Sequence, residues 1–429
     1  MFALLASVSL AATPTADFYV PPRLRGAPAG AQPPPLADGA DLLDVYAAGD
    51  LCVMHDADGE WMSELLSTGL DINWVLESIH DAFFTQYQDE YGYFTIHLVR
   101  DPQIFVAFYS PMSNDVRGIG YEHSVGQQLF DISDTLVEGM IFMNYVGLWI
   151  DNPEQGRYVF DQEFGHRWGS FVQVEKDGVD PEELLGRDTA HWSFYLDTPN
   201  SPMEGNAWVD DGDGSWSTDK ASGSTYSDLD LYLMGLLAKE DVADMTLLQE
   251  SGASPYEAAT APIFMQNTES ITRDATLDAA AVTLSVDDVI TAEGNRMPSV
   301  ENSPKSFRMA HIILVLDGDE LDADLLAQID GLRTTWETDW EEDVRGLADL
   351  DTTLGETTAP CWPETPDACI EEEVDSGDTD DSGDSGDSDA IDCCKEEAPG
   401  GCGCDAGGGM GLAGALLAFG ALARRGRGE

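Results

Sequence analysis

Hydrophobic periodicity, the pattern that most limits what a chain can fold into, is confined here to one stretch from Ala40 to Gly355. The preceding segment, 13–39, is rich in Pro, Ala and Gly, and the chain after Gly355 becomes Asp, Ser and Gly repeats that cannot bury a core. The periodic stretch is long enough for one large domain or two subdomains. We therefore expect folded structure at 40–355 and extended segments on both sides.

Helices and strands are mixed along this stretch. A stripe of Val75, Ile79 and Phe83 predicts a helix at Asn73–Tyr87. Apolar runs predict strands at Phe94–Val99, Ile104–Tyr109, Gly139–Val146 and, much later, His311–Leu316. Asn152 and Pro153 mark the start of another helix, whose apolar residues recur every three or four positions: Val159, Phe160, Phe164, Trp168 and Phe171. A long helix with one apolar face is expected after the last strand.

The helix after Pro153 carries Gln162-Glu163-Phe164-Gly165-His166, one substitution away from the HExxH motif of zinc peptidases. In that motif two histidines four positions apart on one helix face bind Zn²⁺, and the glutamate between them is the general base. Glu163 and His166 occupy the base and second-ligand positions. Gln162 stands where the motif has its first ligand. A neutral amide oxygen is a poor zinc ligand, so we expect this substitution to weaken zinc binding.

This segment and three later ones together resemble a family of secreted bacterial zincin-like metallopeptidases. The later segments are His191-Trp192, Gly205-Asn-Ala-Trp208 and Tyr226-Ser-Asp-Leu-Asp-Leu-Tyr-Leu-Met-Gly235. The resemblance covers most of Val45 to Gly355. It implies an α+β, zincin-like fold: a mixed twisted sheet with an edge strand over an active-site helix, plus a mainly helical C-terminal subdomain. It also implies Zn²⁺ as cofactor, Glu163 as general base and His166 as ligand.

The remaining ligands have to be sought downstream. In the metzincin continuation HxxGxxH, Gly169 matches the glycine, but Val172 stands at the last histidine. His191 is the best remaining imidazole, either as a ligand or as a packing histidine beside Trp192. Asp230, in the helix-like run Leu229–Leu236, is the best carboxylate; a helix-start carboxylate is the alternative role.

Two functions remain open. The first is an exported or cell-surface zinc-metallopeptidase-like protein that hydrolyses peptide bonds by a zinc-activated water if metal is bound. Its substrate would be an extended peptide or protein, paired by strand addition with an edge strand at Val106–Tyr121. The second is a catalytically inactive zincin scaffold that acts as a surface binding or structural module. The sequence does not indicate an oligomeric state.

Charge limits the partners. The chain has 81 acidic and 20 basic residues, a formal net charge of −61. Phosphate binding needs a basic face, so nucleic acid is excluded as a partner, and an anionic membrane surface is disfavoured. Acidic residues also form the Asp210–Ser215 stretch, where we expect a solvated turn because the pattern departs from an EF-hand loop at two positions.

Both ends of the chain are typical of export. Phe2–Ala12 is a short apolar run with small residues at its end, as in a signal peptide. The C-terminus resembles the MYXO-CTERM sorting signal: a cysteine-bearing segment, an apolar stretch and a final arginine cluster. This implies display in the cell envelope or on the outer surface, or secretion after C-terminal processing, with membrane contact only through the apolar stretch.

Cysteines agree with an oxidising compartment. Cys361 and Cys369 bracket a short loop and are able to pair there, while Cys52 is expected to be buried and without a special role. Zinc binding by the C-terminal cysteines is a weaker alternative to the sorting signal. The complete partition is a signal peptide (1–12), a leader (13–39), the zincin-like part with the motif helix (40–236), a C-terminal subdomain (237–355), an acidic, cysteine-containing linker (356–404), a transmembrane or sorting segment (405–423) and a basic tail (424–429).

Overall fold

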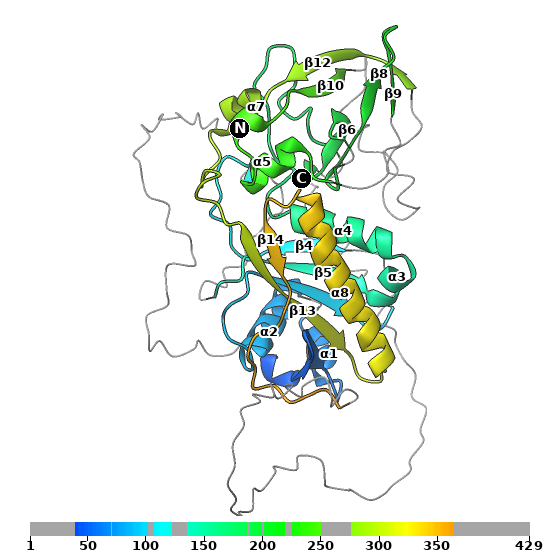
Figure 1. Ribbon diagram of the computed structural model, residues 1–429. Coiled ribbons are helices and arrows are strands. Elements are labelled where there is room, and N and C mark those ends of the chain that lie inside the picture. Colours follow the sequence, from blue (N-terminus) through cyan, green and yellow to red (C-terminus); the bar gives the residue numbers. More distant parts are fainter. Residues whose placement is uncertain are drawn as a thin grey trace, which may run out of the picture.

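The computed structural model describes residues 39–363 except 70, 102–106, 122–134, 187–188, 200, 219–224 and 250–275. These residues form a mixed seven-stranded sheet flanked by helices and two smaller sheets (Figure 1). The expected mixture of helices and strands around a mixed sheet is confirmed. No helix of the described part is long and apolar enough to cross a membrane. The predicted signal peptide, the apolar segment 405–423 and the basic tail lie outside the described residues.

The large sheet has a central strand from late in the chain. Its order is β1 (Asp44–Ala48), β2 (Leu51–His55), β13 (Ser306–Val315), β3 (Tyr93–Leu98), β5 (Gly139–Tyr145) and β4 (Phe108–Pro111), with β14 (Asp349–Asp351) beside β13. β13 runs parallel to both β2 and β3, whereas β4 is antiparallel to β5 at one edge. The segments 40–236 and 237–355 therefore share one sheet.

Three of the four strands expected from apolar runs are found as β3, β5 and β13. The fourth, Ile104–Tyr109, falls partly outside the described residues, and its end lies in the edge strand β4. The helix expected at Asn73–Tyr87 is found as α2 (Ile72–Phe84), with Asp71 accepting a hydrogen bond from the amide of Asn73 as its N-cap. Local periodicity was sufficient for these elements because each buries a simple repeat.

Helices cover both faces of the large sheet (Figure 1). On β13, Ile312 packs in the cluster that contains α1 (Glu60–Ser67) and α2. Its neighbour Ile313 packs in the other cluster, with α3 (Val146–Asp151), α4 (Pro153–Gly165) and α8 (Ala323–Asp343). This alternation follows from the two-residue period of a strand, and it explains why β13 is apolar along its length.

The motif helix is shorter than its sequence pattern predicted. α4 ends at Gly165, and His166 is its C-cap residue, still in right-handed helical conformation. Trp168 and Phe171, which we expected on the same helix, lie beyond it and are buried all the same. Just beyond the helix, the buried charge of Arg167 pairs with Glu138, next to β5 of the large sheet.

The strands of the two smaller sheets come from described residues between 192 and 284. One has the order β12 (Ala280–Leu284), β10 (Met245–Gln249), β6 (Trp192–Asp197) and β7 (Glu204–Asn206). The other contains β11 (Thr276–Asp278), β9 (Ser215–Thr218) and β8 (Trp208–Asp210), with α5 (Asp228–Met234) and α7 (Val286–Glu293) nearby in the chain. The β8–β9 connection is exposed and its aspartates bond within the turn, as expected for Asp210–Ser215.

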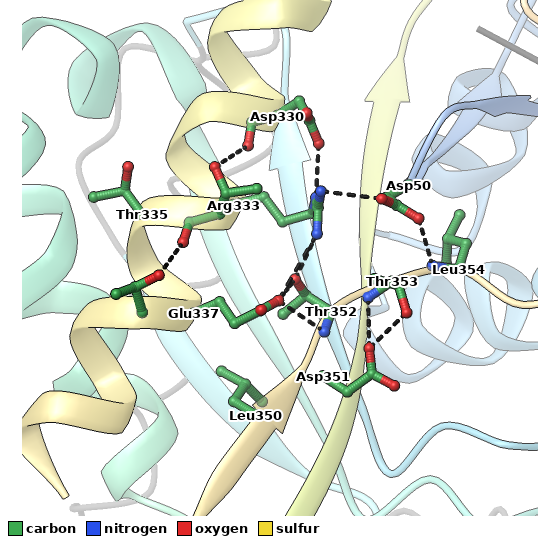
Figure 2. Close-up of polar contacts among 12 residues, drawn as sticks. Asp50, Asp330, Arg333, Thr335, Glu337, Leu350, Asp351, Thr352, Thr353 and Leu354 are labelled. Atoms are coloured by element: carbon green, nitrogen blue, oxygen red, sulfur yellow. Dashed lines mark hydrogen bonds and ion pairs between the residues drawn. The ribbon is translucent and has the colours of Figure 1, made fainter. Parts of the chain in front are cut away.

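A buried arginine on α8 holds the segment around Thr352–Leu354 against the large sheet (Figure 2). Arg333 on α8 donates to Thr352 (2.7 Å) and to Asp50 (3.2 Å). Asp50 also accepts the amide of Leu354. Cys361, farther on, is disulfide-bonded, and Cys52 is free and fully buried as expected. Cys369, the partner expected for Cys361, lies outside the described residues, so that pairing stays a prediction.

Candidate functional site

The last turn of α4 places the motif residues in the interior, below β6 and α5 in Figure 1. Gln162 and Glu163 are only 2% and 4% exposed. Gly165, just before His166, fits closely here: a Cβ atom on it would lie 2.3 Å from Sδ of Met203, so the methionine side chain would have to shift. The segment around Met203 therefore packs directly on the motif turn.

His166 is partly buried at the end of this turn. Its Nδ1 lies 3.2 Å from the carbonyl oxygen of Gly169. A carbonyl oxygen can only accept, so Nδ1 carries the proton in this contact, and the lone pair of the neutral ring is on Nε2. Metal-binding histidines commonly use one ring nitrogen in this way and bind the metal with the other. This contact favours the tautomer with its lone pair on Nε2, one of the two through which histidine binds metals.

Arg167 anchors His166 to the large sheet. Its guanidinium donates to Glu138 (Nη2–Oε2 3.1 Å) and to the hydroxyl of Tyr93 on β3. The arginine is 2% exposed. Removal of one partner from such a shielded ion pair is strongly destabilising, since the other charge stays buried. The pair therefore fixes the position of the motif relative to β3 and β5.

The two histidines selected from the sequence meet in the structure. The ring centroids of His166 and His191 are 4.8 Å apart, with an angle of 88° between the ring planes. Two imidazoles on one tetrahedral Zn²⁺, each with Zn–N about 2.0–2.1 Å, have ring centroids roughly 5 Å apart. The sequence left a ligand role and a packing role open for His191. Its position is compatible with the first.

Glu204 completes the group, and the sequence did not single it out. Its Oε1 lies 3.8 Å from Nε2 of His191 and 3.4 Å from Nε2 of Gln162. The Gln162 amide also donates to the carbonyl of Pro202, at 3.1 Å. Glu204 precedes the Gly205-Asn-Ala-Trp208 segment by one residue, but no local pattern marks it. Its proximity depends on the parallel pairing of β7 with β6, in which Trp192 lies opposite Glu204.

Asp230 lies in the first turn of α5, where its carboxylate is fully engaged. It accepts hydrogen bonds from Trp192 Nε1 (2.7 Å), from Ser201 Oγ (2.6 Å) and from Ser227 in a capping box. Burial raises the pKa of Asp230, and these hydrogen bonds partly offset that effect. Among its contacts in the described structure, none joins Asp230 to Gln162 or His166. It has the helix-start role that the sequence offered as the alternative.

The donors around His166 suit zinc in their chemistry. Two imidazoles and one glutamate form one of the ligand sets that catalytic zinc uses in peptidases. As they stand, no three His, Cys, Asp or Glu side chains of the described residues are grouped closely enough to hold a metal ion. The oriented His166 ring and the spacing of the two imidazoles are the observations that fit the metal.

Comparison with protein-family models, curated proteins and solved structures found no match to this chain.

Proposed function

We propose that this chain is an exported, zincin-like zinc metallopeptidase that cleaves extended peptides. The observation that carries the proposal is the meeting of His166 and His191, with Glu163 buried three residues before His166 in the sequence. The two histidines come from separate segments, one from the end of α4 and one from the residue before β6. A motif match by chance would not be expected to bring a second, distant imidazole to the ligand position.

The proposed roles are metal binding for the two histidines and proton transfer for Glu163. His166 and His191 would hold the metal, with His166 kept in its ligand tautomer by Gly169. Zinc, when bound, acts as a Lewis acid that polarises a carbonyl and acidifies water. Glu163 is the candidate general base, which takes a proton from the attacking water and passes it to the leaving amine.

The edge strand β4 offers a place for substrate. It pairs with β5 on one side, and no described strand pairs with its other side. It also contacts α4, the helix that carries Glu163. An extended peptide added along β4 would form main-chain hydrogen bonds and leave its side chains to select the sequence. The edge-strand arrangement and the parallel strands behind α4 are the features that favour a zincin-like fold.

An inactive zincin scaffold is the second candidate. The observation that favours it is Gln162, whose amide is engaged with Pro202 and Glu204 rather than with an imidazole partner. In that case the same edge strand would bind a protein partner without cleaving it. The expected signal peptide and the expected C-terminal sorting segment support the cell envelope, the outer surface or the medium as the location of either version. Nucleic acid remains an unsuitable partner for a chain of net charge −61.

The test is peptidase activity of the full chain with zinc on an unfolded protein substrate. We expect the Glu163→Gln variant to lose about 10²–10⁴-fold in kcat while it still binds zinc, since general-base catalysis contributes that much. Glu154→Gln is the matched control, because Glu154 lies exposed in the first turn of the same helix. A wild-type chain that binds zinc but cleaves nothing would favour the inactive scaffold.

A further inference from the structure

We propose that residues 355–362 are a strap that closes the β1 edge of the large sheet and is released from it while the domain stays folded. In Figure 1 the strap belongs to the orange segment that follows β14. β1 is the outermost strand at this end of the sheet, and the strap bonds to its outer side. Release would turn this edge into a groove for an extended segment of the same kind. The inference does not depend on the proposed zinc site.

The strap lies on the edge in an extended form. From Glu356 to Cys361 its residues alternate between exposed and partly buried positions, which is the two-residue period of a strand. The amide of Ala47 on β1 donates to the Pro360 carbonyl at 2.9 Å, and the Ala47 carbonyl accepts from the Trp362 amide at 2.8 Å. A free strand edge is a template for pairing with another chain. The strap therefore occupies the hydrogen-bonding groups through which β1 would bind another strand.

Trp362 anchors the strap. Its side chain is buried, and its indole Nε1 donates to the carbonyl of Leu321 at 3.1 Å. The ring meets Tyr46 of β1 and His55 of β2 edge to face, with centroids 5.2 Å and 5.5 Å away. A buried indole whose N–H has a partner is typical of the residues that contribute most to binding. The groove thus selects a tryptophan two residues after the carbonyl that bonds to β1.

The rest of the strap is held by a few polar contacts. The Gly355 amide donates to the hydroxyl of Tyr91 at 2.7 Å, and Thr357 Oγ1 and the Thr358 amide both donate to the carbonyl of Gln86 at 3.1 Å. The pairing with β1 is an isolated bridge and not a ladder. Segments with few buried apolar contacts open at lower free energies than the core. Apart from its aromatic anchor, the strap has this character.

The strap is not joined to the sheet by a disulfide. Cys361 is disulfide-bonded, whereas Cys52, the one cysteine that precedes it in the sequence, is free. The partner of Cys361 is therefore a cysteine that follows the strap, so this bond does not fasten the strap to β1. At its other end the strap continues from the segment that Arg333 on α8 holds through Thr352 (Figure 2). Noncovalent contacts alone close the strap, and the Arg333 end keeps it tethered when it opens.

The test is cleavage of the full chain by a glutamate-specific protease under native conditions. Glu356 has an exposed side chain, but its backbone is held in the strap, so the bond after it should be cut only when the strap is open. Trp362→Ala should speed this cut by about 10²-fold or more, because it removes a large buried side chain. Trp216→Ala on β9 is the matched control and should leave the rate as in wild type. The cut is measured by the mass of the fragment that begins at Thr357.

Thermal melting of each variant separates opening of the strap from unfolding of the domain. Cleavage after Glu356 in Trp362→Ala at a temperature well below its melting transition would support the strap. If the bond is cut only as the whole domain unfolds, the segment is a fixed part of the fold and the inference is wrong. An unchanged cleavage rate in Trp362→Ala would also overturn it.

A synthetic peptide of residues 355–363, with Cys361→Ser, tests the groove itself. Fluorescence anisotropy of the labelled peptide should show tighter binding to the Trp362→Ala chain than to wild type, whose own strap fills the groove. The gain should approach the factor by which the variant opens the strap. The same peptide carrying Trp362→Ala should not bind. Equal binding to both chains, or no binding to either, would overturn the assignment of the β1 edge as a groove for this segment.

Discussion

Two pairs of histidines are in contact among the described residues, and they differ in ring orientation and in the groups around them. His97 and His311 lie on the neighbouring central strands β3 and β13, with Nε2 and Nδ1 3.2 Å apart and nearly parallel rings. His166 and His191 come from two loops next to α4 and β6 and meet edge to face. The first pair lies inside the large sheet layer, whereas the second has the carboxylate of Glu204 3.8 Å from Nε2 of His191.

The surroundings decide what each pair can do. His97 and His311 are each 1% exposed and stack near Trp336. Burial lowers the pKa of His97 to about 3, and burial, His97 and Arg333 lower that of His311 well below its ordinary value. Both stay neutral, and His97 Nδ1 and His311 Nε2 have no hydrogen-bond partner among the described residues. Among the described residues, the contacts of these two rings are with each other and with aromatic side chains rather than with carboxylates.

The comparison teaches that a histidine contact alone does not indicate a metal site. What distinguishes the second pair is the contact of His166 Nδ1 with the Gly169 carbonyl and the carboxylate of Glu204 near His191, which supplies negative charge of the kind that a divalent cation needs. We therefore assign a packing role to the pair in the sheet and propose a ligand role for the pair beside α4. Substitutions should separate these roles.

The largest expected effect is on metal binding. His191→Ala should reduce zinc affinity by more than the roughly 100-fold that supporting residues cost, because it removes a ligand outright. His311→Leu, the matched change in the other pair, should leave zinc affinity as it is. Both are measured by chelator competition on the full chain. Equal losses in the two variants would break the comparison, since they would indicate that general unfolding, not ligand loss, explains the effect.

The next largest effect is on the free energy of unfolding, and it concerns the His97–His311 pair. His311→Leu alone should lower the free energy of unfolding by about 1–3 kcal/mol, because the Nε2 of His97 loses its partner in the interior. Replacing both His97 and His311 by Leu removes both polar groups and should cost clearly less than the single change. Urea unfolding measures both. A double variant that is less stable than the single one would show that the imidazole contact itself is strongly stabilising.

The same pair predicts a dependence on pH. In the unfolded chain these histidines take up protons below their ordinary pKa, near 6.5, whereas the folded chain keeps His97 neutral down to about 3. The unfolded state then binds more protons, so stability is full above pH 6.5 and falls as pH drops toward 3. The slope amounts to about 1.4 kcal/mol per pH unit for each excess proton. The double Leu variant should have a flatter profile over this range.

The smallest effect concerns Asp161, next to Gln162 on α4. Burial raises its pKa well above the ordinary value, Asp343 raises it further and Arg157 opposes the shift. Because the folded state holds this proton more tightly, its contribution is favourable at low pH and is lost as pH rises above the ordinary aspartate value of about 4. Asp161→Asn should therefore be as stable as wild type near neutral pH, or more stable by about 1 kcal/mol. A clear loss of stability at pH 7 would show that the carboxylate is ionised and needed there.

The sequence predicted the elements whose signals are local. α2, β3, β5 and β13 follow from apolar repeats, and Glu163 and His166 were found because the motif spacing puts them in the last turn of α4 and at its C-cap. The position of β13 between β2 and β3 was beyond such patterns, since it joins residues that are far apart in the chain. Glu204 was missed for the same reason. Its place depends on the β6–β7 pairing and on the close packing at Gly165. It also depends on the left-handed backbone conformation of Glu204, which the sequence does not indicate.

X-ray absorption at the zinc edge of the zinc-loaded full chain tests the central claim most directly, because it counts the ligands by type. We predict two imidazoles and only oxygen ligands besides, with Zn–N and Zn–O distances of about 2.0–2.2 Å. A shell of sulfur at about 2.3 Å would instead assign the metal to the C-terminal cysteines, and a spectrum without imidazole would contradict the site at His166 and His191.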